Sequence, residues 1–319
     1  MPNQIEIGIQ SKMFDNFALS CYRNCPAYYE KRIVKKVNKL GAKKTAADFG
    51  SAIHAGLEHY YKEGMTDQAI SESLQVFIDT FTPHQDDADD KRTLGKGLEI
   101  LMKYFDRYRH EPFNVIATEV GGACELEDYM YTVRIDMAVE WLSPKGIYGF
   151  DHKTTSSLHR MVVKPNNQVT GYDYYLKEMY ENVLGYMINA IGVYKEAEEM
   201  DKGAPKVPSP KTGKMIYAKK EREILVRMPT SRTQSELKAW KEQTLHLIHQ
   251  IEESTEKNIW PKHAPEYCTA YRGRCQYIDL CQGQDEDKIL QVLIASGIYQ
   301  IEPWVPYVGV GVEEEEEDG

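Results

Sequence analysis

The chain has 319 residues, of which 42% are hydrophobic and 28% are charged, and this balance is typical of a globular protein and excludes a disordered chain. Its length permits one large domain or two small ones. No apolar run approaches the roughly 20 residues that cross a bilayer, and the N-terminus lacks a basic region followed by an apolar one. We therefore expect a cytoplasmic protein without a membrane partner.

The net charge of −10 is distributed unevenly along the chain. Residues 282–319 contain ten acidic residues and one Lys, and therefore account for −9 of this total. Between Cys21 and Lys44 the sign reverses to a local charge of +7. This basic segment predicts a phosphate-binding surface, whose candidate contacts are Lys31, Arg32, Lys35 and Lys36. The alternative is a solvated helix face.

Hydrophobic periodicity predicts both helices and strands. Apolar residues at helical spacing predict helices over Asp15–Leu40, Ala46–Lys62, Thr66–Phe81, Lys91–His110, Gln168–Lys195, Gln234–Lys257 and Asp285–Ala295. Segments rich in β-branched and aromatic residues predict strands over Asn114–Glu119, Tyr129–Trp141, Gly146–Lys153 and Ile216–Met228. We expect a loop over Ala204–Lys214 and a disordered acidic block over Glu313–Asp318. The predicted fold is α/β, with a central mixed sheet flanked by helices and a helical N-terminal part.

Two carboxylates and an ammonium are predicted to meet at the ends of two strands. Asp151 and Lys153 are two residues apart on one strand and therefore share a face, whereas His152 points the other way. A hairpin about Pro144 would place Asp136 beside this pair. Because buried charges are costly to desolvate, a site for Mg²⁺ explains the cluster better than a structural role.

Further residues around this cluster follow the order of a known family. Phe49–His54 contains a G-x-x-x-H pattern on a predicted helix, and Gln168 and Tyr172 lie four residues apart on a later one. Together with Asp136 and Asp151-His152-Lys153, these residues resemble the RecB-type branch of the PD-(D/E)XK nuclease superfamily. The resemblance spans residues 11–281 and implies a restriction-endonuclease-like core.

The resemblance also implies roles for these residues. His54, Asp136 and Asp151, with the backbone carbonyl of His152, would ligate Mg²⁺ or Mn²⁺, and Lys153 would be catalytic. Gln168 and Tyr172 would position a nucleic-acid strand. Glu119 is expected to be a surface charge at a strand end, with a further acidic group of the site as the alternative. The side chain of His152 is expected to be structural or exposed to solvent.

The six cysteines suggest a second metal centre. Cys268-x6-Cys275-x5-Cys281 lies in a segment with little periodicity, where a metal would supply order, and thiolates favour zinc or iron–sulfur clusters. Three cysteines leave one ligand short. Cys25 is the expected fourth, since one N-terminal Cys before a C-terminal triplet resembles the iron–sulfur nucleases of this branch, such as the nuclease domain of AddB and the CRISPR-adaptation exonucleases. The resemblance implies a structural 4Fe-4S cluster, with Zn²⁺ as the alternative.

The resemblance implies an exonuclease that acts on DNA single strands or duplex ends in recombination, repair or processing, in a bacterial or phage-infected cell. The alternatives are a non-catalytic DNA-binding or assembly subunit and an end-trimming endonuclease. No G-x-x-x-x-G-K-[ST] loop occurs, so a helicase or recombination partner would have to unwind the DNA. We expect a nuclease domain over residues 1–284, a C-terminal helix and extension over 285–312, and the acidic tail over 313–319.

Overall fold

The computed structural model describes residues 12–41, 45–81, 91–209, 212–269 and 274–306. The predicted acidic block Glu313–Asp318 lies outside these ranges. Among the described helices, none is long and apolar enough to span a membrane.

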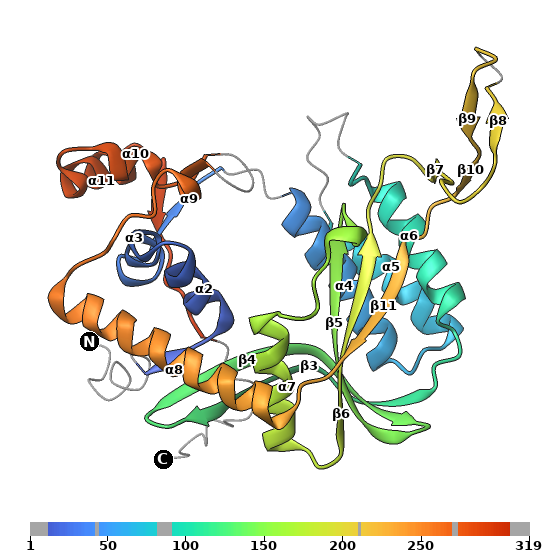
Figure 1. Ribbon diagram of the computed structural model, residues 1–319, viewed down its shortest axis with the longest axis horizontal. Helices are drawn as coiled ribbons and strands as arrows, with labels where there is room; N and C mark the ends of the chain where they lie inside the picture. Colours follow the sequence, from blue (N-terminus) through green and yellow to red (C-terminus); the bar gives the residue numbers. More distant parts are fainter. Residues whose placement is uncertain (1–11, 42–44, 82–90, 210–211, 270–273, 307–319) are drawn as a thin grey trace, which may run out of the picture.

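A six-stranded mixed sheet forms the centre of the fold (Figure 1). Its strands are β1 (Met13–Phe14), β3 (Phe113–Leu126), β4 (Tyr129–Leu142), β5 (Lys145–Thr155), β6 (Val183–Gly192) and β11 (Leu225–Thr230). The order is β1-β4-β5-β6-β11, and β3 pairs along β4. β4 and β5 are antiparallel, whereas β5 and β6 are parallel. The predicted α/β fold with a central mixed sheet is therefore confirmed.

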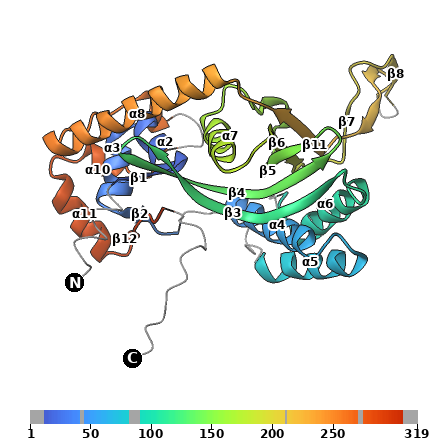
Figure 2. The same ribbon diagram turned by 90° about the horizontal axis from the view of Figure 1, so that it is seen from below.

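Helices cover both faces of this sheet (Figure 2). One face carries α4 (Thr45–Lys62), α5 (Asp67–Thr80) and α6 (Leu94–Arg107), and the other carries α2 (Asn16–Asn24), α7 (Asn167–Met179) and α8 (Gln234–Lys257). Each face has its own apolar core. The predictions for α4, α5, α6 and α8 are confirmed, because their apolar residues recur at helical spacing and Thr233 and Glu236 cap the start of α8 reciprocally.

The predicted helix Gln168–Lys195 is wrong in its second half. α7 ends at Met179, and β6 follows as a strand between β5 and β11. Eight consecutive residues of β6, Gly185 to Gly192, are buried. A strand buried on both faces has a continuous apolar sequence, so periodicity alone does not separate it from a buried helix.

The predicted helix Asp15–Leu40 is also interrupted. α2 ends at Asn24, and α3 (Pro26–Tyr29), the π-helical segment η1 (Glu30–Val34) and strand β2 (Val37–Lys39) follow. Cys25 is extended, which is the conformation favoured before a proline. β2 forms because it pairs with β12 (Tyr299–Ile301), a partner that lies far away in the sequence.

The predicted strand Ile216–Met228 is divided. Only β11 joins the main sheet, whereas β9 (Met215–Tyr217) pairs with β8 (Lys206–Pro208) and β10 (Lys219–Glu221) pairs with β7 (Glu198–Met200). The predicted loop Ala204–Lys214 therefore contains a short strand. These two small ladders form an arm that projects from the body of the protein (Figure 1).

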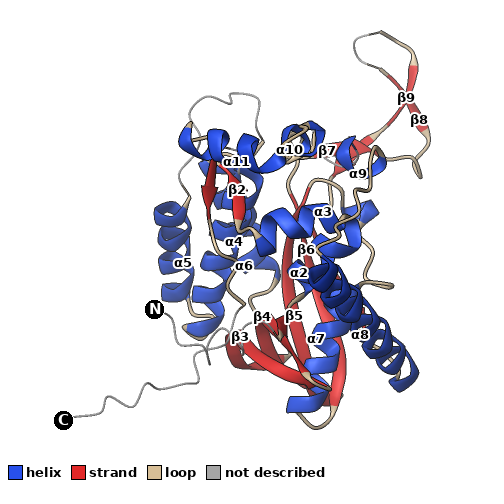
Figure 3. Cartoon of the chain, turned by 90° about the vertical axis from the view of Figure 1, so that its left-hand side faces the viewer, coloured by secondary structure: helices blue, strands red, loops and turns tan. Residues whose placement is uncertain are grey.

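The C-terminal part packs beside the N-terminal part (Figure 3). Its short helices are α9 (Glu266–Thr269), α10 (Ile278–Gln282) and α11 (Glu286–Ala295), and the 3₁₀ helix η2 (Leu158–Arg160) lies earlier in the chain. Val37 of β2 is buried with Tyr277, Leu280 and Tyr299 in a third apolar cluster. The predicted helix Asp285–Ala295 is confirmed within one residue.

Candidate active site

The β4–β5 hairpin places two carboxylates side by side. Met137 pairs with Phe150, and Leu142 pairs with Lys145 at the turn that contains Pro144. The predicted hairpin is therefore confirmed. One residue beyond the Met137–Phe150 pair, this register sets Asp136 of β4 against Asp151 of β5.

Short contacts connect the candidate catalytic side chains in two groups. The imidazole Nδ1 of His54 lies 3.4 Å from Asp136 Oδ2, and the backbone N–H of His152 donates to the same oxygen over 2.5 Å. The Lys153 ammonium lies 3.0 and 2.9 Å from the two oxygens of Asp151. The helix α4 thus contributes His54 to a cluster whose other members come from β4 and β5.

One cavity of about 530 Å³ brings together every side chain predicted for this site. Its lining includes His54, Asp136, Asp151, Lys153, Gln168 and Tyr172. On α7, the Gln168 amide donates to the Tyr172 hydroxyl over 2.9 Å. Gly50 is the glycine of the G-x-x-x-H pattern. A Cβ at this position would lie 3.0 Å from Thr154 Oγ1 of β5, which is a tight contact. The glycine lets α4 approach the strand that carries Asp151.

The environment of the site gives Asp136 and Asp151 different pKa values. Burial raises the pKa of Asp151 and the nearby Asp136 charge adds to this, although Lys153 opposes it. Burial also acts to raise the pKa of Asp136, but the hydrogen bond and charge of His54 outweigh it and lower that pKa. For His54, burial opposes the charged ring, yet Asp136 and Asp151 raise its pKa. The cavity therefore holds two neighbouring carboxyl groups whose charges are compensated by His54 and Lys153.

The side chain of His152 points to the face of the sheet opposite to that of Asp151 and Lys153, where it lies at one end of a buried hydrogen-bond chain. Its Nδ1 lies 2.8 Å from Asn189 Nδ2 of β6, and the same amide nitrogen lies 2.7 Å from the Tyr104 hydroxyl. Tyr104 in turn lies 2.7 Å from the Tyr61 hydroxyl. The expectation of a structural side chain fits this position, and the alternative of exposure to solvent is wrong.

A carboxylate at the far end fixes the direction of these hydrogen bonds. Tyr61 donates to Glu111 over 2.8 Å, and Arg227 also donates to Glu111 over 2.8 Å. Tyr61 has then used its only proton, so Tyr104 must donate to Tyr61 and accept from the Asn189 amide. The other hydrogen of that amide faces His152.

His152 therefore accepts at Nδ1 and carries its proton on Nε2. Burial lowers the pKa of this ring to about 3, so the ring is neutral. Sequence patterns do not reveal this chain of Tyr61, Tyr104, Glu111, Asn189 and Arg227, except that Asn189 interrupts the apolar β6 segment.

Glu119 also lines the cavity, which fits the alternative of a further acidic group better than that of a surface charge. It lies on β3 between residues that pair with Met137 and Ile135, which flank Asp136 on β4. Its side chain forms an ion pair with Arg134, another lining residue. Burial raises the pKa of Glu119, and Arg134 opposes this effect.

Backbone contacts bring the four predicted cysteine ligands into one region. Ala27, two residues after Cys25, donates its N–H to Pro261 over 3.1 Å, and Cys275 donates its N–H to Cys268 over 2.8 Å. Burial raises the pKa of Cys275, and the charges of Cys268, Cys281 and Cys25 add to this effect. Cys25 and the C-terminal cysteines therefore lie in the same region of the fold.

The remaining cysteines, Cys21 and Cys124, are buried in the main apolar core. Over the described ranges, no three His, Cys, Asp or Glu side chains are already arranged as a group that could hold a metal ion.

The predicted phosphate-binding surface is wrong for Lys31. Its side chain is only 2% exposed, and its ammonium lies 3.2 Å from Glu30 and 2.8 Å from Glu286 of α11. The cation is enclosed by the C-terminal helix, so a phosphate has no access to it.

Arg32 and Lys35 also pair with acidic residues of the C-terminal part, but Lys35 is 31% exposed, and phosphate binding by these two residues stays a prediction. Arg32 lies 3.2 Å from Glu302, and Lys35 lies 3.0 Å from Asp287. Lys36 is exposed. The acidic C-terminal part therefore pairs with three of the four predicted phosphate contacts.

Comparisons with known proteins show the family to which the chain belongs. The family model of the PD-(D/E)XK nuclease superfamily matches residues 17–282, and the chain belongs to that superfamily. A crystal structure from Eubacterium rectale, described as a "putative exonuclease", is 11% identical with a TM-score of 0.43, covering 88% of this chain and 96% of its own. No curated protein matches the chain.

Proposed function

We propose that this chain is a metal-dependent deoxyribonuclease of the RecB-type branch, acting as an exonuclease on single strands or duplex ends. The observation that carries the proposal is the convergence of His54, Asp136, Asp151 and Lys153 on one cavity. Membership of the nuclease superfamily supports hydrolysis of phosphodiester bonds. The preference for ends rests on the resemblance to RecB-type exonucleases.

The donor set fits Mg²⁺ or Mn²⁺. Asp151 Oδ2 is buried and forms an ion pair with Lys153, but it accepts no hydrogen bond. A buried carboxylate oxygen with spare acceptor capacity is the ligand that these cations prefer. His54, Asp136 and Asp151, with the His152 carbonyl, would hold the ion, which when bound would polarise the phosphate and lower the pKa of a water molecule.

Lys153 acts in this proposal as a cation and hydrogen-bond donor. Burial opposes its charged form, but Asp151 raises its pKa, so the ammonium stays protonated. A protonated lysine beside the scissile phosphate would orient the attacking water and stabilise the negative charge that develops at phosphorus.

Gln168 and Tyr172 are suited to hold the substrate strand. Because the Gln168 amide donates to the Tyr172 hydroxyl, the hydroxyl proton and the Gln168 carbonyl are left for a ligand. Burial raises the pKa of Tyr172, which keeps the hydroxyl protonated as a donor. The pair would contact the nucleotide next to the cleaved bond.

The proposal includes a 4Fe-4S cluster held by Cys25, Cys268, Cys275 and Cys281, with Zn²⁺ as the alternative. Their proximity supports it, since thiolates are the usual ligands of both centres. The cluster would join the N-terminal α3 region to the C-terminal segment and so stabilise the fold.

The first experiment measures cleavage of linear single-stranded and double-stranded DNA with Mg²⁺ or Mn²⁺. Lys153→Ala is expected to lower the rate by about 10²-fold or more while DNA binding is kept. Lys145→Ala, on the same strand but exposed and paired with Glu140, is the matched control. Cleavage by Lys153→Ala at the wild-type rate would overturn the proposal, and an inactive wild type that binds DNA would indicate a non-catalytic subunit.

A closed circle of single-stranded DNA separates the two kinds of nuclease. An exonuclease degrades the linear strand and leaves the circle intact, because it requires an end. Opening of the circle would show instead that the protein is an endonuclease.

Elemental analysis of anaerobically purified protein tests the cysteine centre. Iron with acid-labile sulfide supports the cluster, zinc supports the alternative, and neither metal contradicts both. Cys25→Ser is expected to lose the metal, whereas Cys124→Ser, at a thiol buried in the main core, is expected to keep it.

A further inference from the structure

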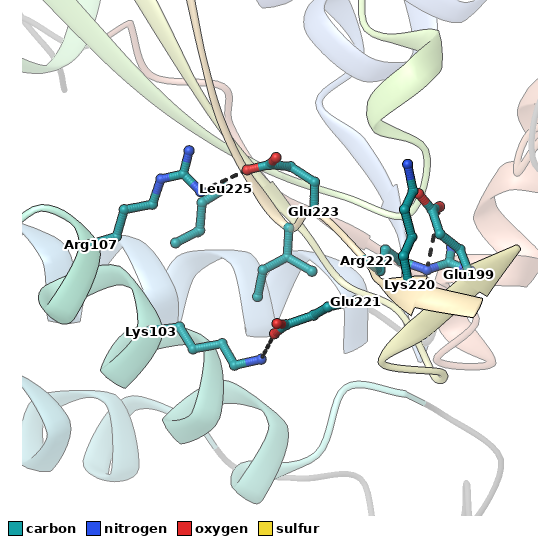
Figure 4. Close-up of a pocket in the computed structure, with 9 residues that line it drawn as sticks. Lys103, Arg107, Glu199, Lys220, Glu221, Arg222, Glu223 and Leu225 are labelled. Atoms are coloured by element: carbon teal, nitrogen blue, oxygen red, sulfur yellow. Dashed lines mark hydrogen bonds and ion pairs between the residues drawn. The ribbon is translucent and has the colours of Figure 1, made fainter. Parts of the chain in front are cut away.

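The arm, which the structure describes over residues 198–209 and 212–221, is held by ion pairs at its base. At the base, Lys219 pairs with Glu198 at 3.1 Å and Lys220 with Asp201 at 3.7 Å. Figure 4 shows the junction with the body, where Lys103 and Arg107 of α6 face Glu221 and Glu223. These two pairs measure 3.0 and 2.7 Å. The base is thus locally neutralised and held against α6.

The outer part of the arm differs in charge. From Lys202 to Tyr217 the sequence contains lysines and no acidic residue. Lys202, Lys206 and Lys214 are exposed. In the part of the chain that the structure describes, none of these three lysines forms an ion pair with a carboxylate. The outer arm therefore presents cations that pair with no described carboxylate.

The pairing of β8 with β9 adds apolar and aromatic groups to this charge. Lys206 pairs with Tyr217, and its ammonium lies 5.2 Å from the centre of the tyrosine ring. Met215, which is 57% exposed, lies on the same face of the ladder. Cations beside an aromatic ring and a thioether suit a nucleic-acid strand, because lysines neutralise phosphates and flat or soft side chains contact the bases.

The topology relates the arm to the active site. β6 is parallel to β5, and Lys153 pairs with Ala190 and Thr155 with Gly192. The two strands therefore end at the same edge of the sheet, near the Asp151–Lys153 pair. The chain leaves β6 at this edge and enters the arm (Figure 1).

We propose that the outer arm is a second nucleic-acid contact, in which Lys202, Lys206 and Lys214 bind phosphates of the substrate at a distance from the bond being cut. The inference rests on the proposed nuclease function. The charge of the surface selects a polyanion as its ligand, and a partner protein is the alternative that the experiment excludes or supports.

The experiment compares two triple variants by fluorescence anisotropy with a labelled DNA strand and a chelator, so that no cleavage occurs. Lys202→Ala/Lys206→Ala/Lys214→Ala removes the unpaired cations. Lys238→Ala/Lys257→Ala/Lys288→Ala removes as much charge, but from exposed lysines that already pair with acids on their own helices. Thermal unfolding checks that both variants remain folded.

The arm variant is expected to bind a long strand about 10-fold more weakly, with a salt dependence reduced by about one ion per lysine removed. The control variant should keep more of the wild-type affinity and more of the wild-type salt dependence. Tyr217→Ala should weaken binding and leave the salt dependence unchanged, since it removes no charge.

Equal affinity and equal salt dependence of the two triple variants would overturn the inference. A cleavage assay with a strand too short to reach the arm distinguishes failure of the arm inference from failure of the nuclease proposal. If the arm variant cleaves short strands normally and long strands poorly, both proposals hold. If the wild type cleaves neither the short nor the long strand, but the arm variant binds DNA more weakly than the wild type, only the nuclease proposal fails.

Discussion

The basic segment at Lys31–Lys36 and the outer arm are both rich in lysine, but the fold treats their charges differently. Lys31 and Lys35 contact Glu286 and Asp287 from a distant part of the chain. Lys206 contacts the ring of Tyr217 and, among the residues that the structure describes, pairs with no carboxylate. The segment with the higher density of positive charge in the sequence is the one that is neutralised. Charge density along a sequence is thus a poor guide to a phosphate-binding surface.

The physical reason is the cost of burying an unpaired charge. An ammonium removed from water must acquire a carboxylate or lose its proton, so a buried cation implies a partner. An exposed cation has no such requirement. We therefore expect the effects of substitutions on stability to follow the burial of each ion pair, and losses of DNA affinity to follow from substitution of the exposed lysines of the outer arm.

The largest loss of stability is expected at the pair of Glu111 and Arg227, whose side chains are 2% and 14% exposed. Glu111→Ala leaves the guanidinium without its carboxylate and is expected to cost about 3–5 kcal/mol in the free energy of unfolding. Urea denaturation measures this cost. Glu140→Ala, which breaks the exposed pair with Lys145, is the control and should cost less than about 1 kcal/mol.

Glu111→Ala also tests the direction of the hydrogen bonds in the chain that runs from Glu111 to His152. In the wild type, ¹⁵N NMR is expected to show neutral His152 with its proton on Nε2. Glu111→Ala removes the carboxylate that orders the chain, so a mixture of tautomers is expected. An unchanged single tautomer in the variant would contradict the ordering by Glu111.

A smaller loss is expected for Lys31→Ala, because Glu286 keeps a second partner in Lys262 at 2.7 Å. We expect a cost of about 2 kcal/mol and no change in DNA affinity. Lys36→Ala, at an exposed neighbour, should change stability by less than about 0.5 kcal/mol. A clear loss of DNA affinity in Lys31→Ala, without unfolding, would break the comparison.

The Glu286 pair should also make stability depend on pH. Burial acts to raise the pKa of Glu286, but Lys262 and Lys31 outweigh it and lower that pKa. Its contribution is therefore present above the unfolded-state pKa of about 4.5 and is lost as pH falls through the lower folded-state pKa. Glu286→Gln should show a shallower loss of stability below about pH 4.5 in urea denaturation than the wild type. Parallel curves would show that the carboxylate does not contribute.

The smallest effect on stability is expected in the arm. Lys206→Ala removes an exposed side chain with one cation–π contact, so the free energy of unfolding should change by less than about 0.5 kcal/mol. Its DNA affinity should nevertheless fall. A loss of stability similar to that of Lys31→Ala would show that the two regions do not differ as proposed.

Local patterns were sufficient to predict several elements and the arrangement of the site. The apolar spacing of α4 and the capping residues of α8 act within one or two turns, and the turn at Pro144 joins adjacent strands. Because side chains alternate along a strand, Asp151 and Lys153 had to share a face. The functional roles of these residues remain predictions.

The sequence by itself determined what neighbouring residues decide: amphipathic helices, a hairpin register, and a cluster of charged groups at strand ends. Only the tertiary structure decided that β6 is a central strand, that β2 pairs with β12, and that Glu286 encloses Lys31. Burial on both faces and long-range pairing depend on partners that are distant in the chain, so no local pattern carries that information.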